Sequence, residues 1–330
     1  MKVLRLHGPG DLHLHDEPVP TAGPDQALVR VMAVGLCGSD LHWFSEGSIG
    51  DAALGHPLVL GHEFAGLAET GERVAVDPAI PCGACEACSE GNPNLCTSIR
   101  FMGHSAEDGA LREQIAVPRR CLFPLPPSFA DADGAMLEPL GVALHAVDLG
   151  HVKPGMSVGV FGCGSVGLLI VQLARAAGAT TIIATDPLLH RLDAARAFGA
   201  TTIRAEDGRE AEEVWAAAGR RGVDVAFEAA GADAAVATAI ATAKPGARVV
   251  LVGIPDDDRT TFTASVARRK GLTLKLSRRM KHTYPRAIRL VTSGQVDVRS
   301  LVTHRFPLHQ FAQAFATAQR REGIKVVIEP

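Results

Sequence analysis

Four closely spaced cysteines have the residue type and the spacing of a metal site: Cys82, Cys85, Cys88 and Cys96. A loop of this length can fold back so that four thiolates surround one Zn²⁺ tetrahedrally, which leaves no open position for chemistry. Glycines and a proline within the segment favour a tight chelating loop. An iron–sulfur cluster is the main alternative, and disulfides or packed thiols are weaker ones. The spacing therefore predicts a structural metal site, with zinc as the favoured ion.

A second set of ligand types, Cys37 with the adjacent pair His62 and Glu63, predicts a different kind of metal site. A thiolate, an imidazole and a carboxylate all bind zinc, and three protein ligands leave one coordination position for a substrate. We therefore expect an open, reactive zinc here in addition to the structural one, which makes two zinc ions per chain.

The overall composition fits a globular enzyme. The chain of 330 residues is longer than one hydrophobic core usually supports, so we expect two domains. The net charge of -3 gives no electrostatic argument for binding nucleic acid or a membrane. The first residues lack a signal-peptide-like apolar stretch, so cytoplasmic localisation is the expectation. Two further cysteines, Cys121 and Cys163, are interpreted as packed side chains.

Hydrophobic patterning divides the chain into three segments. Residues 1–134 carry short alternating runs, such as 26–31 and 71–76, which are typical of half-buried antiparallel strands. Residues 135–277 alternate alanine-rich helices with strands that are apolar on both faces, at 158–161, 181–184, 223–227 and 248–252. This alternation predicts an α/β doubly wound parallel sheet covered by helices. Residues 278–330 again mix helical and strand patterns, with a helix near 308–320 and a last strand at 325–328.

A glycine-rich loop near the start of the middle segment predicts a dinucleotide site. Gly162, Gly164 and Gly167 form a GxGxxG pattern between a predicted strand and a predicted helix. The glycines let a pyrophosphate approach the free amides and the positive end of the helix. Asp186 ends the next strand and is placed to bond the adenosine ribose hydroxyls, so NAD is favoured over NADP. Arg191 is the feature that favours NADP, and an ordinary glycine-rich turn is the alternative for the loop.

The chain resembles the zinc-containing medium-chain alcohol dehydrogenases over nearly its whole length, and within them the sorbitol and L-idonate dehydrogenase branch. The matching segments are 37–42, 61–63, 82–96, 137–140, the glycine-rich loop with Asp186, 283–288 and 302–308. The resemblance implies a GroES-like, mostly β catalytic domain at 1–134, an NAD-binding Rossmann domain at 135–277 and a C-terminal return to the catalytic domain at 278–330. It also implies an active site in the cleft between the domains, and assembly as a homotetramer or homodimer.

The resemblance also implies residues around the catalytic zinc. Glu138 occupies the motif in which simple alcohol dehydrogenases carry a cysteine, so we expect it near the metal, bound directly or through a water. The sequence leaves open whether Glu63 or Glu138 ligates the zinc directly. Asp40 is expected to hydrogen-bond His62 and fix its tautomer.

The implied chemistry is hydride transfer from a zinc-polarised alcohol to the nicotinamide. Ser39 and His42 are implied to carry the released proton through the cofactor ribose to solvent, and Glu138 to take part in catalysis. Taken alone, a serine or a histidine is more often a turn, surface or packed residue. The remaining cofactor contacts assigned to the chain are Ser165, Val166, Gly253, Ile254 and Ser277.

Trp43 and Arg279 are the implied substrate contacts, although Trp43 suits a core position equally well and Arg279 a solvated charge. Segment 66–73 is shorter than in relatives, and Gln114 and Met280 replace aromatic residues. We therefore expect an NAD- and zinc-dependent enzyme that reversibly oxidises a secondary hydroxyl of a small-molecule polyol or sugar acid to a ketone. Simple alcohols or small diols are the alternative substrates, and a non-catalytic nucleotide-binding protein is a distant alternative.

Overall fold

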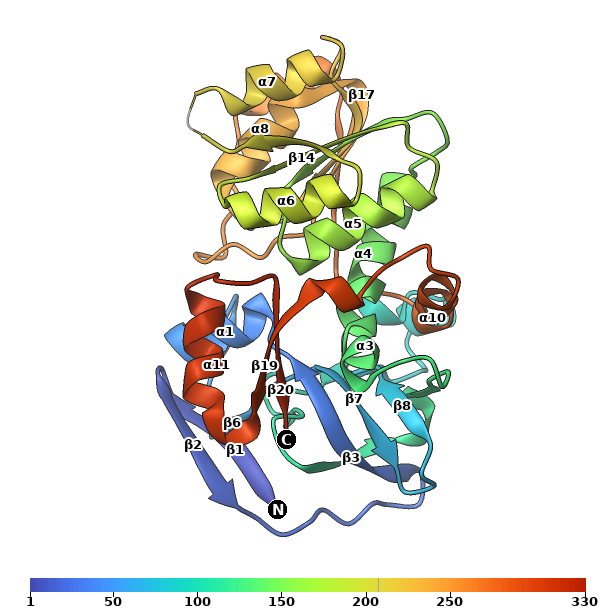
Figure 1. Ribbon diagram of the computed structural model, residues 1–330, viewed down its shortest axis with the longest axis vertical. Helices are drawn as coiled ribbons and strands as arrows, with labels where there is room; N and C mark the ends of the chain where they lie inside the picture. The colour runs from blue at the N-terminus through green and yellow to red at the C-terminus, as the bar shows by residue number, and fades with distance from the viewer. Residues whose placement is uncertain (207) are drawn as a thin grey trace. The chain divides into compact units, whose positions relative to one another are not determined.

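The computed structural model describes residues 1–206 and 208–330 (Figure 1). Contacts divide the chain into two compact units. The first unit consists of Met1–Pro139, Lys281–Ser293 and Val298–Pro330, and the second of Leu140–Met280 and Gly294–Asp297. Helix α4 (Leu137–Gly150) begins in the first unit and continues into the second.

A mostly antiparallel sheet with the strand order β12-β8-β7-β3-β20-β19 organises the first unit, and β11 also pairs with β3. Its strands are β3 (Gln26–Gly35), β7 (Glu63–Ala68), β8 (Arg73–Val76), β11 (Gln114–Pro118), β12 (Leu122–Pro124), β19 (Val302–Pro307) and β20 (Lys325–Glu329). Strand β3 alternates buried Val29 and Val31 with exposed Arg30, as the sequence pattern predicts. A short turn joins β7 to β8, where Leu67 pairs with Arg73.

A hairpin of β1 (Lys2–Gly8) and β2 (Asp11–Asp16) forms a second sheet with β6 (Leu58–Val59), in the order β2-β1-β6. Leu4 pairs with Leu14, and Leu6 with Leu12, on the face that turns toward the core. Because side chains alternate along a strand, the opposite face carries Arg5 and its partner His13.

The remaining elements of the first unit are short. They are β4 (Ser48–Ile49), β5 (Ala52–Ala53), β9 (Ala79–Ile80), β10 (Arg100–Phe101), α1 (Gly38–Glu46), α2 (Glu86–Ser89), α3 (Asp131–Ala135), α10 (Tyr284–Thr292), α11 (Phe311–Gln319) and the 3₁₀ turns η1 (Pro93–Leu95), η2 (Arg119–Cys121), η3 (Arg299–Leu301) and η4 (Leu308–Gln310). The Tyr284 hydroxyl donates to the Val76 carbonyl at 2.8 Å, which ties α10 to β8.

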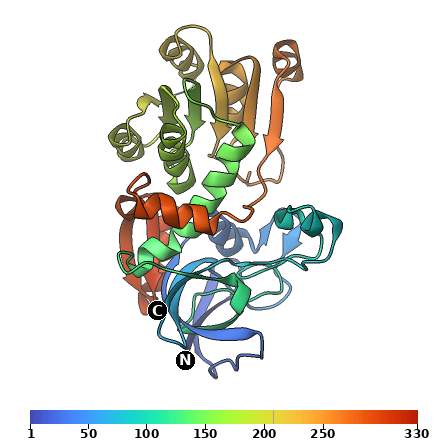
Figure 2. The ribbon, with the colours of Figure 1, turned by 90° about the vertical axis from the view of Figure 1, so that its right-hand side faces the viewer.

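A parallel sheet with helices on its faces forms the second unit (Figure 2). Its order is β15-β14-β13-β16-β17-β18, the doubly wound arrangement of dinucleotide-binding domains. The strands are β13 (Ser157–Phe161), β14 (Thr181–Asp186), β15 (Thr201–Arg204), β16 (Val223–Glu228), β17 (Ala243–Leu251) and β18 (Thr273–Leu276), and the helices are α5 (Ser165–Ala176), α6 (Leu189–Ala197), α7 (Glu210–Ala217), α8 (Asp233–Thr242) and α9 (Ala264–Lys270).

The predicted fold class is confirmed, because a mostly β unit accompanies a doubly wound parallel sheet. Strands β13, β14, β16 and β17 coincide with the apolar runs of the sequence, since their side chains are buried on both faces. Sequence patterning missed β15 and β18. These two are the outer strands of the sheet, and their exposed residues weaken the apolar signal.

Candidate active site

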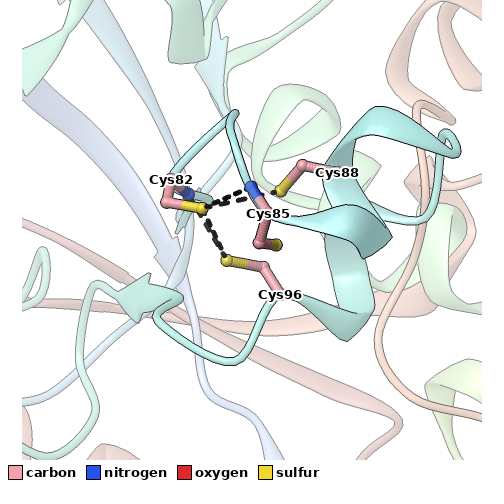
Figure 3. A group of neighbouring side chains, drawn as sticks. All are labelled: Cys82, Cys85, Cys88 and Cys96. Carbon is pink, nitrogen blue, oxygen red and sulfur yellow. Dashed lines mark hydrogen bonds between the residues drawn. The ribbon is translucent and has the colours of Figure 1, made fainter.

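The four cysteines predicted to bind a structural metal converge in a lobe built by α2 and η1 (Figure 3). Their sulfur atoms all lie within 4.8 Å of one another, and within the described part of the chain all four are free thiols rather than disulfides. The amides of Ala84 and Cys85 lower the pKa of Cys82 to about 6, while burial raises the pKa of Cys88 to about 12. Neighbouring thiolates repel one another, so a divalent cation is what allows all four to ionise.

Cys37, His62 and Glu63 also come together, with one donor atom from each residue within 4.8 Å of the others. Their proximity follows from strand pairing. Cys37 follows the end of β3 and precedes α1, whereas Glu63 begins β7, and Gly35 of β3 pairs with Glu63. The ligand types far apart in the sequence therefore meet because β3 and β7 are neighbours in the sheet.

Asp40 lies fully buried beneath this cluster and orients two of its members. One carboxylate oxygen accepts the amide of Cys37 at 2.9 Å, and the other accepts the amide of Gly61 at 3.1 Å. The second oxygen also lies 3.5 Å from Nδ1 of His62. Burial alone would raise the pKa of Asp40, but His62 and these amides lower it. Asp40 thus stays ionised and holds both chain segments that supply ligands.

Lys325, on β20, forms a buried ion pair with Glu63 that the sequence analysis did not anticipate. Its Nζ donates to the two carboxylate oxygens of Glu63 at 2.8 and 2.5 Å and to the Leu36 carbonyl at 3.0 Å. The side chains of Lys325 and Glu63 are 3% and 1% exposed. Burial alone would lower the pKa of Lys325, but Glu63 and Cys37 raise it. The available signal was a lysine placed directly before the apolar run Val326–Ile328.

Glu138 is buried in the first turn of α4, at 5% exposure. Burial raises the pKa of Glu138 to about 7, since its carboxylate is taken from water, and the charge of Glu63 acts in the same direction. His62 and Lys325 oppose this shift. A carboxyl group with this pKa can hold or release a proton near neutral pH.

Helix α1 carries Ser39 and His42 one turn apart, and both side chains are partly exposed. Nδ1 of His42 lies 3.5 Å from Oε1 of Glu46. Trp43, on the same helix, is only 1% exposed and packs edge-on against His104. Its burial fits the core position that the sequence also allows, and a contact with substrate stays a prediction.

The glycine-rich loop lies between β13 and α5, as the strand-loop-helix pattern requires. Gly162 has a φ of +102°, and a Cβ there would meet the Ala230 amide at 2.8 Å. A Cβ on Gly167 would lie 1.9 Å from the Gly162 carbonyl oxygen, so α5 can pack against the loop only with glycine. Gly164 is the N-cap of α5, with Ser165 and Val166 in the first turn, and as a glycine it has no side chain to cap these amides. They suit a pyrophosphate.

Asp186 ends β14 beside this loop and is 4% exposed. Its carboxylate accepts the amides of Cys163 and Leu188, each at 2.8 Å, and Nη1 of Arg191 lies 4.0 Å away. Nη1 of Arg191 also lies 3.9 Å from a Cβ built on Gly164. Asp186, which favours NAD, and Arg191, which favours NADP, are therefore close neighbours.

The other predicted cofactor contacts follow β17 and β18 in the second unit. A Cβ on Gly253 would lie 2.1 Å from the Gly231 amide, so two loops approach closely here. Ile254 is 50% exposed, and the Ser277 amide donates to the Leu251 carbonyl at 2.8 Å. Arg279 also belongs to the second unit, so its role as a substrate contact stays a prediction.

A mostly β unit with two metal-ligand clusters and a doubly wound unit with a nucleotide loop together define a metal-dependent dehydrogenase. The chain matches the family described as alcohol dehydrogenase GroES-like domain over residues 23–127 and the family described as zinc-binding dehydrogenase over residues 165–293. It belongs to the zinc-containing medium-chain alcohol dehydrogenases and to their polyol branch.

Individual relatives agree with this membership. Sorbitol dehydrogenase of Bacillus subtilis is 36% identical over 100% of this chain and 97% of its own length. Probable D-xylulose reductase A of Aspergillus clavatus is 36% identical over 98% of this chain and 95% of its own. The crystal structure of L-idonate 5-dehydrogenase from Escherichia coli superposes with a TM-score of 0.91, at 26% identity, over 100% of this chain and 98% of that chain. None of the helices in the described residues has the length and apolarity to cross a bilayer.

Proposed function

We propose that the chain uses NAD to oxidise a secondary hydroxyl of a polyol or sugar acid to a ketone, reversibly, at a zinc held by Cys37, His62 and Glu63. The convergence of these three donors within 4.8 Å, oriented by buried Asp40, is the observation that carries the proposal. The identity of the relatives as sorbitol dehydrogenase, xylulose reductase and L-idonate dehydrogenase supports this class of substrate.

The donor set fits zinc, because sulfur, imidazole nitrogen and carboxylate oxygen are its ordinary protein ligands. When bound, zinc supplies Lewis acidity that makes a hydroxyl at the fourth position easier to deprotonate, and NAD supplies the hydride acceptor. With one thiolate instead of two, the site is harder and suits oxygen-rich substrates. The four-cysteine lobe fits a second zinc, which has a structural role.

Lys325 contributes the charge balance of the site. The charges of Cys37, Glu63 and Asp40 exceed those of a divalent ion by one, and the charge of Lys325 brings the sum to zero. Each oxygen of Glu63 bonds Lys325 with one lone pair and keeps another for the metal. We therefore infer that Glu63 is the third ligand and that Lys325 offsets the excess negative charge of the groups around the metal.

Proton release is assigned to residues of the first unit. Ser39 would take the proton of the substrate hydroxyl as it gives up its own, and His42, which is partly exposed on the next turn of α1, would release a proton to solvent. Glu138 has a pKa raised to about 7, so it can hold a water by hydrogen bonding in either protonation state. Arg279 remains the proposed contact for a further substrate hydroxyl.

A substrate panel tests the proposal directly. Purified chain with two zinc ions should reduce NAD with sorbitol, xylitol, threitol or idonate at kcat/KM values well above those for butanediol and ethanol. Cys37→Ala, which removes a ligand, is the matched inactive control. Preference for ethanol or butanediol would overturn the substrate class, and full activity of Cys37→Ala would overturn the site.

We propose NAD rather than NADP as the preferred cofactor. Asp186 would repel a 2′-phosphate, whereas Arg191 beside it would attract one, and the buried carboxylate is the group already oriented by two amides. The ratio of kcat/KM for NAD to kcat/KM for NADP tests this preference. Equal or better use of NADP contradicts the assignment.

Assembly as a homodimer or homotetramer and cytoplasmic localisation complete the proposal. Strand β18 lies at one end of the parallel sheet, and its residue Leu276 is 78% exposed, which supports pairing of this edge with a second copy. Sedimentation of the wild type and of Leu276→Lys tests this route to a dimer. A monomeric wild type would contradict it.

A further inference from the structure

Three histidines gather on the outer face of the β1–β2 hairpin, apart from both cysteine-containing clusters. His7 lies on β1, and His13 and His15 lie on β2. The ring centroids of His7 and His15 are 5.1 Å apart, those of His7 and His13 are 5.5 Å apart, and those of His13 and His15 are 6.4 Å apart. Imidazole nitrogen is a common ligand for zinc, copper and nickel, so this grouping merits a metal interpretation.

The two ring nitrogens that point at each other have a separation that suits one ion. Nε2 of His7 lies 2.9 Å from Nε2 of His15. Two nitrogens at about 2.0–2.1 Å from a metal and at a right angle to each other are about 2.8–3.0 Å apart, whereas a tetrahedral angle requires about 3.3 Å. A right angle between nitrogen ligands is the arrangement of tetragonal Cu²⁺ and Ni²⁺ sites.

The hairpin fixes the backbone positions from which the histidine side chains project. On the opposite face, Leu6 and Leu12 pair across the strands and are buried in the core. Arg5, between the histidines, is fixed by ion pairs with Glu17 and Asp108. The strand positions of the ligands are therefore set without any ion, and binding costs mainly side-chain ordering.

A third donor stands next to the pair. Nε2 of His13 contacts Oδ1 of Asp11 at 2.6 Å, and the side chains of His13 and Asp11 are 59% and 55% exposed. An exposed side chain changes rotamer easily, so His13 can turn toward the pair, and water completes the coordination.

We propose that His7 and His15 bind one divalent transition-metal ion, Ni²⁺ or Cu²⁺, at a third metal site of the chain. One imidazole of the pair donates its Nε2 hydrogen to the other. On binding, that hydrogen moves to Nδ1 of the same ring and both rings turn so that their Nε2 lone pairs face the ion, without a net loss of protons. The order of affinity is Cu²⁺ above Ni²⁺ above Co²⁺. The site does not depend on the proposed reaction.

Calorimetric titration of the untagged, zinc-loaded chain with Ni²⁺ tests the site. We expect one saturable equivalent in the wild type, with the zinc content unchanged at two per chain, and retention of the chain on an immobilised Ni²⁺ column. His7→Gln and His15→Gln should each weaken the affinity by about tenfold or more. Circular dichroism and zinc content show whether each variant is folded.

His309→Gln is the matched control, because His309 is exposed on η4 and lies outside the hairpin. It should bind Ni²⁺ as the wild type does. Absence of saturable binding in the folded wild type overturns the proposal. The proposal is also overturned if His309→Gln weakens the affinity for Ni²⁺ as much as His7→Gln and His15→Gln do, or if both hairpin variants bind Ni²⁺ as tightly as the wild type.

Discussion

Replacing Lys325 with methionine should destabilise the first unit far more than the loss of an ordinary surface ion pair. Methionine keeps the unbranched apolar stem but removes the ammonium group, which contacts both oxygens of Glu63 and the Leu36 carbonyl. Glu63 is 1% exposed and cannot recover this interaction from water. The carboxylate would lose its buried counter-charge.

The magnitude follows from the burial of both partners. Removal of one member of a buried ion pair typically costs about 3–5 kcal/mol, because the other charge is left uncompensated. Zinc coordinated by Glu63 would reduce that cost in the loaded chain, so the lower end of the range applies there. Glu63→Gln removes the opposite charge and leaves Lys325 uncompensated. The double variant lacks both charges, so its cost should be about 2–3 kcal/mol less than the sum of the two single costs.

Urea unfolding measures this coupling in the Cys37→Ala chain and, in the same background, in both single variants and the double variant, so that every chain carries only the structural zinc. The midpoint and slope of each curve give the free energy of unfolding. Lys2→Met is the matched control, since Lys2 pairs with Asp16 at a site where both side chains are largely exposed. It should change the stability little. Metal analysis confirms that all samples carry one zinc ion.

Additivity of the two single variants within about 0.5 kcal/mol would refute the reasoning. It would show that Lys325 and Glu63 contribute independently and that the ion pair carries no special energy. A cost for Lys325→Met no larger than that of Lys2→Met would refute the claim of an uncompensated buried charge. Either outcome would also remove the support for Lys325 in the charge balance of the site.

Three further outcomes are expected. Partial burial alone would raise the pKa of Asp224, but Lys244 lowers it to about 2. Asp224→Asn should therefore reduce the free energy of unfolding by about 2 kcal/mol near pH 7. This difference should shrink as the pH falls from about 4 to 2, because the wild-type carboxylate then becomes protonated as well. Urea unfolding at several pH values measures it. Cys37→Ala should retain one zinc per chain by metal analysis and lose turnover by about 10²-fold or more. Gly167→Ala should lower kcat/KM for NAD by about 10²-fold with unchanged zinc content, because its Cβ would lie 1.9 Å from the loop carbonyl.

Much of the architecture could be predicted because its signals are local. The four cysteines are close in sequence, so their spacing alone constrains the lobe in which their sulfurs converge. The glycine-rich loop carries its strand and helix with it, and the apolar runs of the second unit mark strands buried on both faces. Resemblance to a known family then joined these pieces into two domains and one reaction.

The rest depends on partners that sequence distance hides. Lys325 and Glu63 are 262 positions apart, and only the pairing of β20 with β3, and of β3 with β7, brings them together. The burial of Trp43 likewise depends on tertiary packing rather than on its place after a motif. The sequence could not place the ring of His7 beside that of His15, because His15 pairs with Val3 in the hairpin and the two rings meet only through the directions of their side chains.

The insertion of β20 between β3 and β19 has a consequence for biosynthesis. The ribosome completes the continuous stretch Leu140–Met280 before it makes β20. The nucleotide-binding unit can therefore fold while the sheet of the first unit still lacks this strand. Until then the end of β3 at Val34 and Gly35 lacks its partner strand, and Glu63 has no ammonium group beside it. Nascent chains are therefore most exposed to chaperones and to misassembly during the synthesis of the last segment, and peptides added close to β20 should lower the yield of folded protein.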